Sequence, residues 1–168
     1  MLKTRREKLT VLIRDFHPND TEQFLAVARD LQTFELALYD RMMAVDAIGE
    51  WYIDTLLKQC AEEDGSILVA ELDSQIIGFA TIFTKVQQQG ELDEVPFTYG
   101  FISHISVTPA ARGTGTGKLL LAECERRARE AGCRWLRIPT LAKNAQARGI
   151  YEHLGFSEHL VTLEKTLA

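Results

Sequence analysis

The sequence predicts an α/β fold with a central, mostly antiparallel sheet of six or seven strands and about four flanking helices. Three patterns support this prediction. Two β-branched segments in the first half are separated by a short polar turn, strands and helices alternate in the second half, and apolar residues recur every three or four positions in the expected helices. A strand–helix–strand unit places its two strands side by side, so the fourth and fifth strands should be parallel.

The first half of the chain supplies one strand, two helices and a hairpin. Asn19, Asp20 and Thr21 are residue types that cap helices, and the apolar residues from Phe24 to Leu38 then follow a helical period. The segment Asp73-Ser74-Gln75 is short enough to join its flanking strands as an antiparallel hairpin. In order, the expected elements are a strand over 9–13, helices over 24–38 and 51–60, and strands over 66–72 and 76–86.

The second half alternates strands with helices. Gly155 should end the last helix, because glycine is the usual residue just past a helix C-terminus. In order, the expected elements are a polar loop over 87–96, a strand over 98–107, a helix over 115–131, a strand over 134–140, a helix over 143–154, and one bent strand or two short strands over 156–166. No repeat or linker interrupts the chain, so we expect residues 1–168 to form a single domain.

The composition restricts the possible partners. The net charge of −5, from 19 Lys and Arg against 24 Asp and Glu, argues against binding to a nucleic-acid backbone. The cysteines, Cys60, Cys124 and Cys133, are odd in number and lack the C-x-x-C spacing of a zinc or redox site, so no metal is expected. No apolar stretch resembles a signal sequence or a membrane span, so we expect a cytoplasmic protein without a membrane partner.

A glycine-rich segment, Arg112-Gly113-Thr114-Gly115-Thr116-Gly117-Lys118, connects the fourth strand to the next helix. Its glycines let the backbone curl so that consecutive N–H groups point outward, and the helix N-terminus adds a partial positive charge. Arg112 and Lys118 flank the segment and can reach a diphosphate or a ribose phosphate. These features predict a phosphate-binding turn. Its spacing fits neither a Walker loop nor a dinucleotide fingerprint.

The spacing Arg112-x-x-Gly115-x-Gly117 resembles the coenzyme A loop of the GNAT superfamily of N-acetyltransferases. A second segment, Asn144-x-x-Ala147-x-x-Ile150-Tyr151-x-x-x-Gly155-Phe156, resembles the other signature of that family and follows in the expected order. The resemblance covers roughly residues 65–166. It implies the GNAT fold, in which the parallel strands four and five splay apart. Pro139 in the fifth strand is consistent with the splay, because proline cannot donate a ladder hydrogen bond.

The resemblance also implies that acetyl-CoA is the cosubstrate. Ile105, Ser106 and Val107 would pair with the pantetheine arm through the edge of strand four. Asn144 would hydrogen-bond the pantetheine, and Tyr151 would act as the general acid that protonates the departing sulfur. The implied cofactor-binding residues are Ile105, Ser106, Val107, Arg112, Gly113, Thr114, Gly115, Thr116, Gly117, Lys118, Asn144, Ala147 and Tyr151.

The general base is not evident from the sequence. Phe101 occupies the strand-four position that holds a glutamate base in the histone acetyltransferase branch, and Ser103 stands where many relatives carry another acid. His104 is then the nearest titratable side chain and a candidate catalytic base. A water chain and the acids of the preceding loop remain alternatives; these acids are Glu91, Asp93 and Glu94.

We therefore predict an N-acetyltransferase that moves an acetyl group from acetyl-CoA to a primary amine of a small molecule, peptide or protein, by direct attack in a ternary complex. One alternative is a coenzyme A-binding sensor or regulatory domain with little turnover. Another is a loop that binds a different phosphate ligand, such as a nucleotide. The amine acceptor and the oligomeric state are left open, a homodimer included. Candidate acceptor contacts are Phe34, Tyr39, Asp40, Trp51, Tyr52 and Tyr99.

Overall fold

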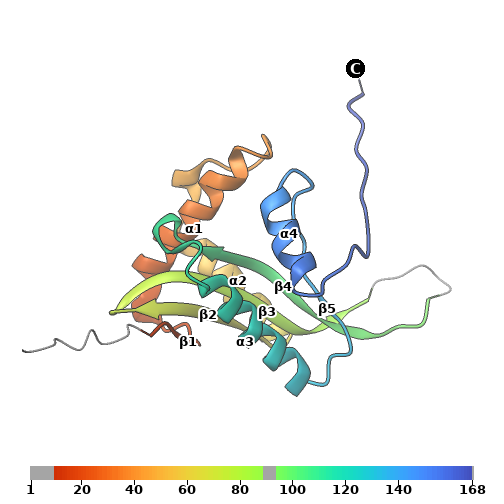
Figure 1. Cartoon of the computed structure of the whole chain (residues 1–168), viewed down its shortest axis with the longest axis horizontal. Helices are drawn as coiled ribbons and strands as arrows, with labels where there is room; N and C mark the ends of the chain where they lie inside the picture. The colour runs from red at the N-terminus through yellow and green to blue at the C-terminus, as the bar shows by residue number, and fades with distance from the viewer. Residues whose placement is uncertain (1–9, 89–93, 168) are drawn as a thin grey trace, which may run out of the picture.

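The computed structural model describes residues 10–88 and 94–167. Its sheet contains five strands in the order β1 to β5, and neighbouring strands are antiparallel except for the parallel pair β4 and β5 (Figure 1). The predicted mixed, mostly antiparallel sheet is thereby confirmed. The strands are β1 (Leu12–Asp15), β2 (Gly65–Leu72), β3 (Gln75–Gln87), β4 (Thr98–Val107) and β5 (Leu136–Arg137).

Among the described residues, four α-helices flank the sheet, with α1 and α2 on one face and α3 on the other (Figure 1). They are α1 (Thr21–Leu36), α2 (Glu50–Glu62), α3 (Thr116–Glu130) and α4 (Ala145–His153). The described ranges also contain short 3-10 helices: η1 (Pro18–Asp20), η2 (Val45–Ala47) and η3 (Pro109–Ala111). Within the described ranges, no helix has the length and apolar content that crossing a membrane requires.

Each face of the sheet carries its own apolar core. Phe24 of α1 and Phe79 of β3 are fully buried on one face, with their ring centroids 4.5 Å apart. On the other face, Leu120 and Cys124 of α3 pack in one cluster with Ile102 of β4. Burial of each large apolar side chain contributes roughly 1.5–3 kcal/mol. The two cores hold β3 and the first part of β4 between helices, which fixes the sheet on which the site is built.

A partly buried ion-pair network ties the first strand to its neighbours. Arg14 of β1 donates to Asp20 of η1 at 2.7 Å and to Glu71 of β2 at 2.6 Å. Asp20 also accepts a hydrogen bond from the backbone N–H of His17 at 2.8 Å. The Arg14 guanidinium is the main reason why the pKa of Asp20 lies below its usual value. The network positions α1, which begins directly after η1.

The parallel strands β4 and β5 splay apart as predicted. They pair only at Gly100 with Leu136 and at Phe101 with Arg137. Beyond Phe101, no strand among the described residues pairs with β4 on this side. Pro139 lies two residues after β5, in a segment without strand structure. On its other side β4 contains a bulge, since the register with β3 shifts next to Ser103.

Two of the predicted strand assignments are wrong. β5 spans two residues instead of 134–140, because the splay removes the neighbour with which the later residues would pair. Residues 156–166 form no strand, which leaves five strands in the described ranges instead of six or seven. Apolar residues such as Leu160 and Leu163 have strand propensity, yet they are 84% and 90% exposed. Ion pairs hold this segment to side chains outside the sheet, at Glu158 to Arg148 and at Glu164 to Arg41.

Candidate active site

The glycine loop, residues 112–118, presents an open row of backbone N–H groups. Gly113 and Gly115 have φ angles of 75° and 92°, which L side chains rarely adopt, so glycine is required there by backbone conformation. Among the hydrogen bonds of the described residues, none uses an N–H group of residues 113–118 as donor. Three of these groups belong to the first turn of α3, where the helix dipole favours an anion. The loop can therefore bind a phosphate group.

Side chains of the loop hold its shape. The Thr114 hydroxyl donates to the carbonyl of Ala111 at 2.7 Å and lies 2.9 Å from the hydroxyl of Thr116, which is buried. The Arg112 guanidinium donates to the carbonyl of Val107 at 3.3 Å, and Lys118 is exposed. The threonine hydroxyls thus stabilise the turn from inside, and the loop offers an anion its N–H groups and two basic side chains.

The open edge of β4 leads from this loop into the splay. Ile105, Ser106 and Val107 pair with β3 on one side, and β5 has already diverged on the other. Backbone groups on a free strand edge can pair with an extended ligand. A strand edge that can pair with an extended ligand therefore lies next to a turn whose free N–H groups can bind a phosphate.

Where β4 and β5 part, they leave a cavity of about 70 Å³, which we call the splay cavity. It brings together side chains from α1, β4, the segment after β5, and α4. The lining residues are Leu31, Glu35, Ile102, Ser103, His104, Ile105, Ile138, Pro139, Thr140, Leu141, Asn144 and Tyr151. Four of the predicted site residues therefore line the same cavity: His104, Ile105, Asn144 and Tyr151. Ser106, Val107, Ala147 and the glycine loop are outside this lining.

Asn144 reaches the splay cavity as the N-cap of α4. Its side-chain oxygen accepts from the backbone N–H of Ala147 at 3.1 Å, so α4 begins at Ala145 and the predicted start at 143 is wrong. The capping hydrogen bond uses the side-chain oxygen of Asn144 as acceptor and the backbone N–H of Ala147 as donor. The amide hydrogens of the Asn144 side chain have no hydrogen-bond partner among the described residues. Tyr151, two turns further along, lines the same cavity, as its spacing predicted.

A family model described as the Acetyltransferase (GNAT) family matches residues 20–156. The chain belongs to the GNAT acetyltransferase family. With this family's chemistry, the protein is an acetyl-CoA dependent N-acetyltransferase.

The acetyltransferase has curated relatives of low identity. An aminoglycoside N(6')-acetyltransferase type 1 from Stenotrophomonas maltophilia is 28% identical over 107 residues, which are 63% of this chain and 69% of that protein. A mycothiol acetyltransferase from Nocardiopsis dassonvillei is 29% identical over 113 residues, 65% of this chain. That match spans only 34% of the mycothiol acetyltransferase.

Solved structures share the fold of the acetyltransferase. A single-site mutant of the BH1408 protein from Bacillus halodurans superposes with a TM-score of 0.82 at 18% identity, over 94% of this chain and 99% of that one. The aminoglycoside N-acetyltransferase AAC(6')-Iy in complex with CoA superposes with a TM-score of 0.69 at 21% identity, over 96% and 99% of the two chains. At identities of 18% and 21%, these superpositions show a shared fold.

Tyr151 of the acetyltransferase is protonated at neutral pH. Burial, and to a lesser extent the negative charge of Glu35, raise the pKa of Tyr151 to about 12. The ring packs against Phe156 with centroids 5.9 Å apart, which keeps the phenol at the cavity wall. A phenol in this state can donate a proton or a hydrogen bond to a group in the cavity.

His104 is a weak base in the acetyltransferase. Burial lowers the pKa of His104 to about 4, so the imidazole is neutral at pH 7. The Ser103 hydroxyl lies 3.0 Å from Nδ1 of His104. The imidazole ring forms a T-shaped contact with the ring of Tyr52, with the two centroids 5.6 Å apart. Of the alternative bases, Glu94 is exposed and accepts from Gln88 at 3.2 Å; Glu91 and Asp93 lie outside the described residues.

The candidate acceptor aromatics do not form one cage. Tyr52 packs against the ring of His104, whereas Tyr99 lies near the start of β4, with the Arg137 guanidinium 4.1 Å from its ring centroid. Trp51 is 45% exposed and donates to the carbonyl of Ala47 at 2.7 Å. The remaining three candidates lie in or just after the last turns of α1: Phe34, Tyr39 and Asp40.

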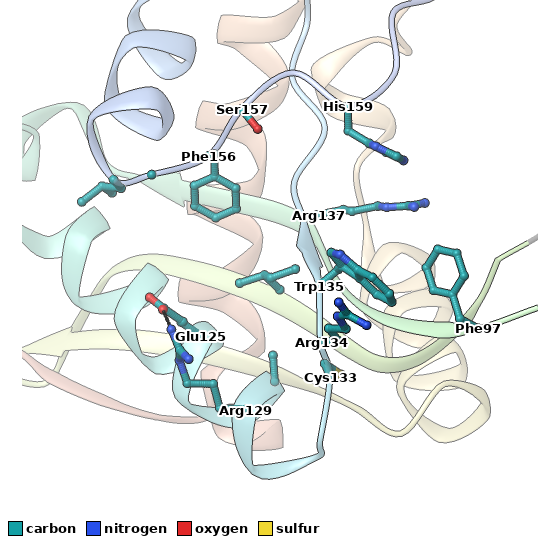
Figure 2. A pocket seen from close by; sticks show the side chains of 14 residues that line it. Phe97, Glu125, Arg129, Cys133, Arg134, Trp135, Arg137, Phe156, Ser157 and His159 are labelled. Carbon is teal, nitrogen blue, oxygen red and sulfur yellow. Dashed lines mark hydrogen bonds and ion pairs between the residues drawn. The ribbon is translucent and has the colours of Figure 1, made fainter.

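A larger hollow of about 540 Å³ lies outside the predicted site, beside β5 at the edge of the sheet. Figure 2 shows Trp135 and Phe97 at one end of it and Phe156 at the other. Its lining contains none of the residues predicted to bind coenzyme A or to catalyse the reaction. The hollow occupies the side of β5 on which a further strand would have paired.

Sequence reasoning missed Glu35, the acidic residue of the splay cavity. Glu35 follows Leu31 by one helical turn, and both side chains line the cavity. The available signal was an acid directly after Phe34, one of the residues of the predicted apolar face of this helix. Such a position also suits a solvated charge, and only the fold shows that it faces β4 and α4.

Proposed function

We propose that this protein transfers the acetyl group of acetyl-CoA to a primary amine of a small molecule by direct attack of the amine in a ternary complex. One observation carries the proposal. The free N–H groups of the glycine loop, the open edge of β4 and the splay cavity with Tyr151 follow one another along the same strand. An extended donor bound along this line would place its thioester at the cavity.

Coenzyme A would be held mainly by backbone groups. The N–H groups of residues 113–118 would bind the diphosphate, assisted by the side chains of Arg112 and Lys118. The pantetheine arm would add to β4 as a short strand along Ile105, Ser106 and Val107. The free amide hydrogens of Asn144 would donate to a pantetheine carbonyl from the opposite side.

The chemical step would need no covalent acyl-enzyme. The neutral amine attacks the thioester carbon, and a backbone N–H on the free edge of β4 stabilises the negative charge that develops on the carbonyl oxygen. The carbon–sulfur bond then breaks while Tyr151 gives its proton to sulfur. Burial raises the pKa of Tyr151 to about 12, so the phenol holds its proton when the donor binds and can give it to the sulfur as the carbon–sulfur bond breaks.

A small-molecule acceptor is supported by two curated relatives whose names specify an aminoglycoside and mycothiol. Identities of 28% and 29% leave the acceptor itself undetermined. Phe101 at the position of the usual glutamate base favours the competing function, a coenzyme A-binding sensor with little turnover.

A turnover screen decides between the two functions. Thiol release from acetyl-CoA is measured with a panel of primary amines that contains neamine, glucosamine, spermidine and lysine, and calorimetry compares coenzyme A with ATP and NAD. The proposal predicts steady thiol release with at least one amine and preference for coenzyme A. Tight binding of coenzyme A without release for any amine supports the sensor, and preference for ATP or NAD contradicts both.

A further inference from the structure

We propose that the Glu35 carboxylate is the catalytic base of this acetyltransferase: it binds the ammonium group of the acceptor and takes its proton. The inference rests on the proposed function and adds the residue that the sequence did not supply. It also specifies the acceptor class, which is an amine that carries a positive charge in solution.

The position of Glu35 is fixed by the fold. It lies in the last turn of α1, at the end of the helix that passes over the free part of β4. Its side chain lines the splay cavity from the α1 side, whereas His104 lines it from β4 and Tyr151 from α4. An amine that approaches the thioester in this cavity therefore has Glu35 on one side and Tyr151 on another.

The carboxylate of Glu35 has no partner of its own. Within the described ranges, no hydrogen bond or ion pair engages the Glu35 side chain, although the residue is only partly exposed. No lysine or arginine lines the splay cavity, and His104 is neutral at pH 7, so Glu35 is the one acidic side chain of the described lining and no cation there pairs with it. A half-buried unpaired carboxylate is costly, and an ammonium group is the ligand that offsets this cost.

The backbone around Glu35 adds to the negative potential. Glu35 stands at the C-terminal end of α1, where the helix dipole carries a partial negative charge. Its own carbonyl accepts from the N–H groups of Leu38 and Tyr39 at 2.9 and 2.8 Å, which fixes this helix end in place. The C-terminal end of α1 and the carboxylate of Glu35 therefore both favour the binding of a cation in the cavity.

Burial makes Glu35 a stronger base and His104 a weaker one. Removal from water raises the pKa of Glu35, because the charged form of a carboxyl group is the form that loses hydration. The same cause lowers the pKa of His104 to about 4, because its charged form is the protonated one. Tyr151, which lines the cavity from α4, and Tyr52, which packs against His104 from α2, have raised pKa values and stay neutral. Glu35 is thus the group best able to accept a proton.

The protons balance in the following sequence. One proton of the acceptor ammonium passes to the Glu35 carboxylate, and the neutral nitrogen attacks the thioester carbon. The carbon–sulfur bond breaks, and Tyr151 protonates the departing sulfur. The second proton that the nitrogen must lose restores the phenol of Tyr151, and Glu35 releases its proton to water. The products are the acetamide, the thiol of coenzyme A and one proton in solution.

Glu35→Gln tests the proposal, with Glu22→Gln as the matched control. Both residues lie on α1, and Glu22 is exposed near the opposite end of the helix. For the amine of the panel that the wild type acetylates fastest, we expect kcat/KM of Glu35→Gln to fall by about 100-fold or more. Coenzyme A affinity should stay within about twofold, which also shows that the variant is folded. Glu22→Gln should match the wild type.

Two further readouts separate a base from a structural residue. The acid limb of the kcat/KM profile, which should lie above the usual carboxyl range, should be absent in Glu35→Gln, and Glu35→Asp should recover part of the activity. Ultraviolet titration of the tyrosines should show a lower pKa for Tyr151 in Glu35→Gln, because the nearby negative charge is gone. An unchanged kcat/KM in Glu35→Gln, or an unchanged acid limb, overturns the role of Glu35 alone. A wild type that acetylates no amine overturns the proposed function as well.

Discussion

Glu35 of α1 and Tyr151 of α4 line the same cavity, and the charge of Glu35 adds to burial in raising the pKa of Tyr151 to about 12. The two side chains come from opposite ends of the chain and meet where β4 parts from β5. One is a carboxyl group with a raised pKa and the other a phenol that remains protonated. A proton acceptor and a proton donor thus flank the place where the thioester would lie.

Tyr151→Phe should impair chemistry without impairing donor binding. Only the hydroxyl is removed, and the ring contact with Phe156 is kept. We expect kcat to fall by about 100-fold, because the sulfur must then leave without an acid, while coenzyme A affinity changes by less than about twofold. Steady-state kinetics and calorimetry measure the two effects. A wild-type kcat would mean that another group or water protonates the sulfur.

Gly117→Asp should weaken coenzyme A binding without destabilising the fold. A Cβ at Gly117 would meet Val107 at an ordinary 3.6 Å, and the residue has no positive φ, so substitution is tolerated there. An acid in the first turn of α3 suits the helix dipole but repels a diphosphate. We expect affinity to drop by more than about tenfold, with an unchanged or higher Tm.

Gly117→Ala is the matched control, since it adds the Cβ without the charge. It should bind coenzyme A nearly as well as the wild type. Gly115 is less suitable for this comparison, because its φ of 92° would add backbone strain to any effect on the ligand. Equal affinity in Gly117→Asp and Gly117→Ala would place the diphosphate elsewhere.

His104→Gln should make the protein more resistant to acid. Above pH 6.5 the imidazole is neutral in both the folded and the unfolded chain, so its titration does not change stability there. Between pH 6.5 and about 4 the unfolded chain binds a proton that the folded chain excludes, so the wild type loses stability as pH falls. The loss should reach about 3 kcal/mol, and the variant should not show it. Urea unfolding of both proteins at pH 7 and pH 4 measures the difference.

Asp20→Asn should destabilise the fold at neutral pH. The pKa of Asp20 is lowered chiefly by its hydrogen bond with Arg14, so the carboxylate stabilises the folded state above the unfolded value of 3.8. We expect a loss of about 1–3 kcal/mol at pH 7 that shrinks as pH falls below about 4, because the wild type then loses the same charge. A difference independent of pH would assign the effect to packing.

The sequence predicted the donor side of the site better than the acceptor side. The bounds of β4 were predicted correctly, because its apolar residues and the glycine loop after it are local signals. The segment 156–166 has strand composition as well, but strand formation depends on a neighbouring edge that sequence patterns do not show. Glu35 was missed for a similar reason: its closeness to Tyr151 is created by the splay of β4 from β5, not by spacing along the chain.

The most direct test of acetyl transfer by this site is a paired measurement on the wild type and Glu35→Gln. Thiol release and acetylated amine are quantified together, by absorbance and mass spectrometry, with acetyl-CoA and the best amine of the panel. We predict one acetylated amine for each thiol released by the wild type. For Glu35→Gln we predict a rate that is lower by about 100-fold or more, at unchanged coenzyme A affinity. Thiol release without acetylated amine, or equal rates for the two proteins, would contradict the mechanism.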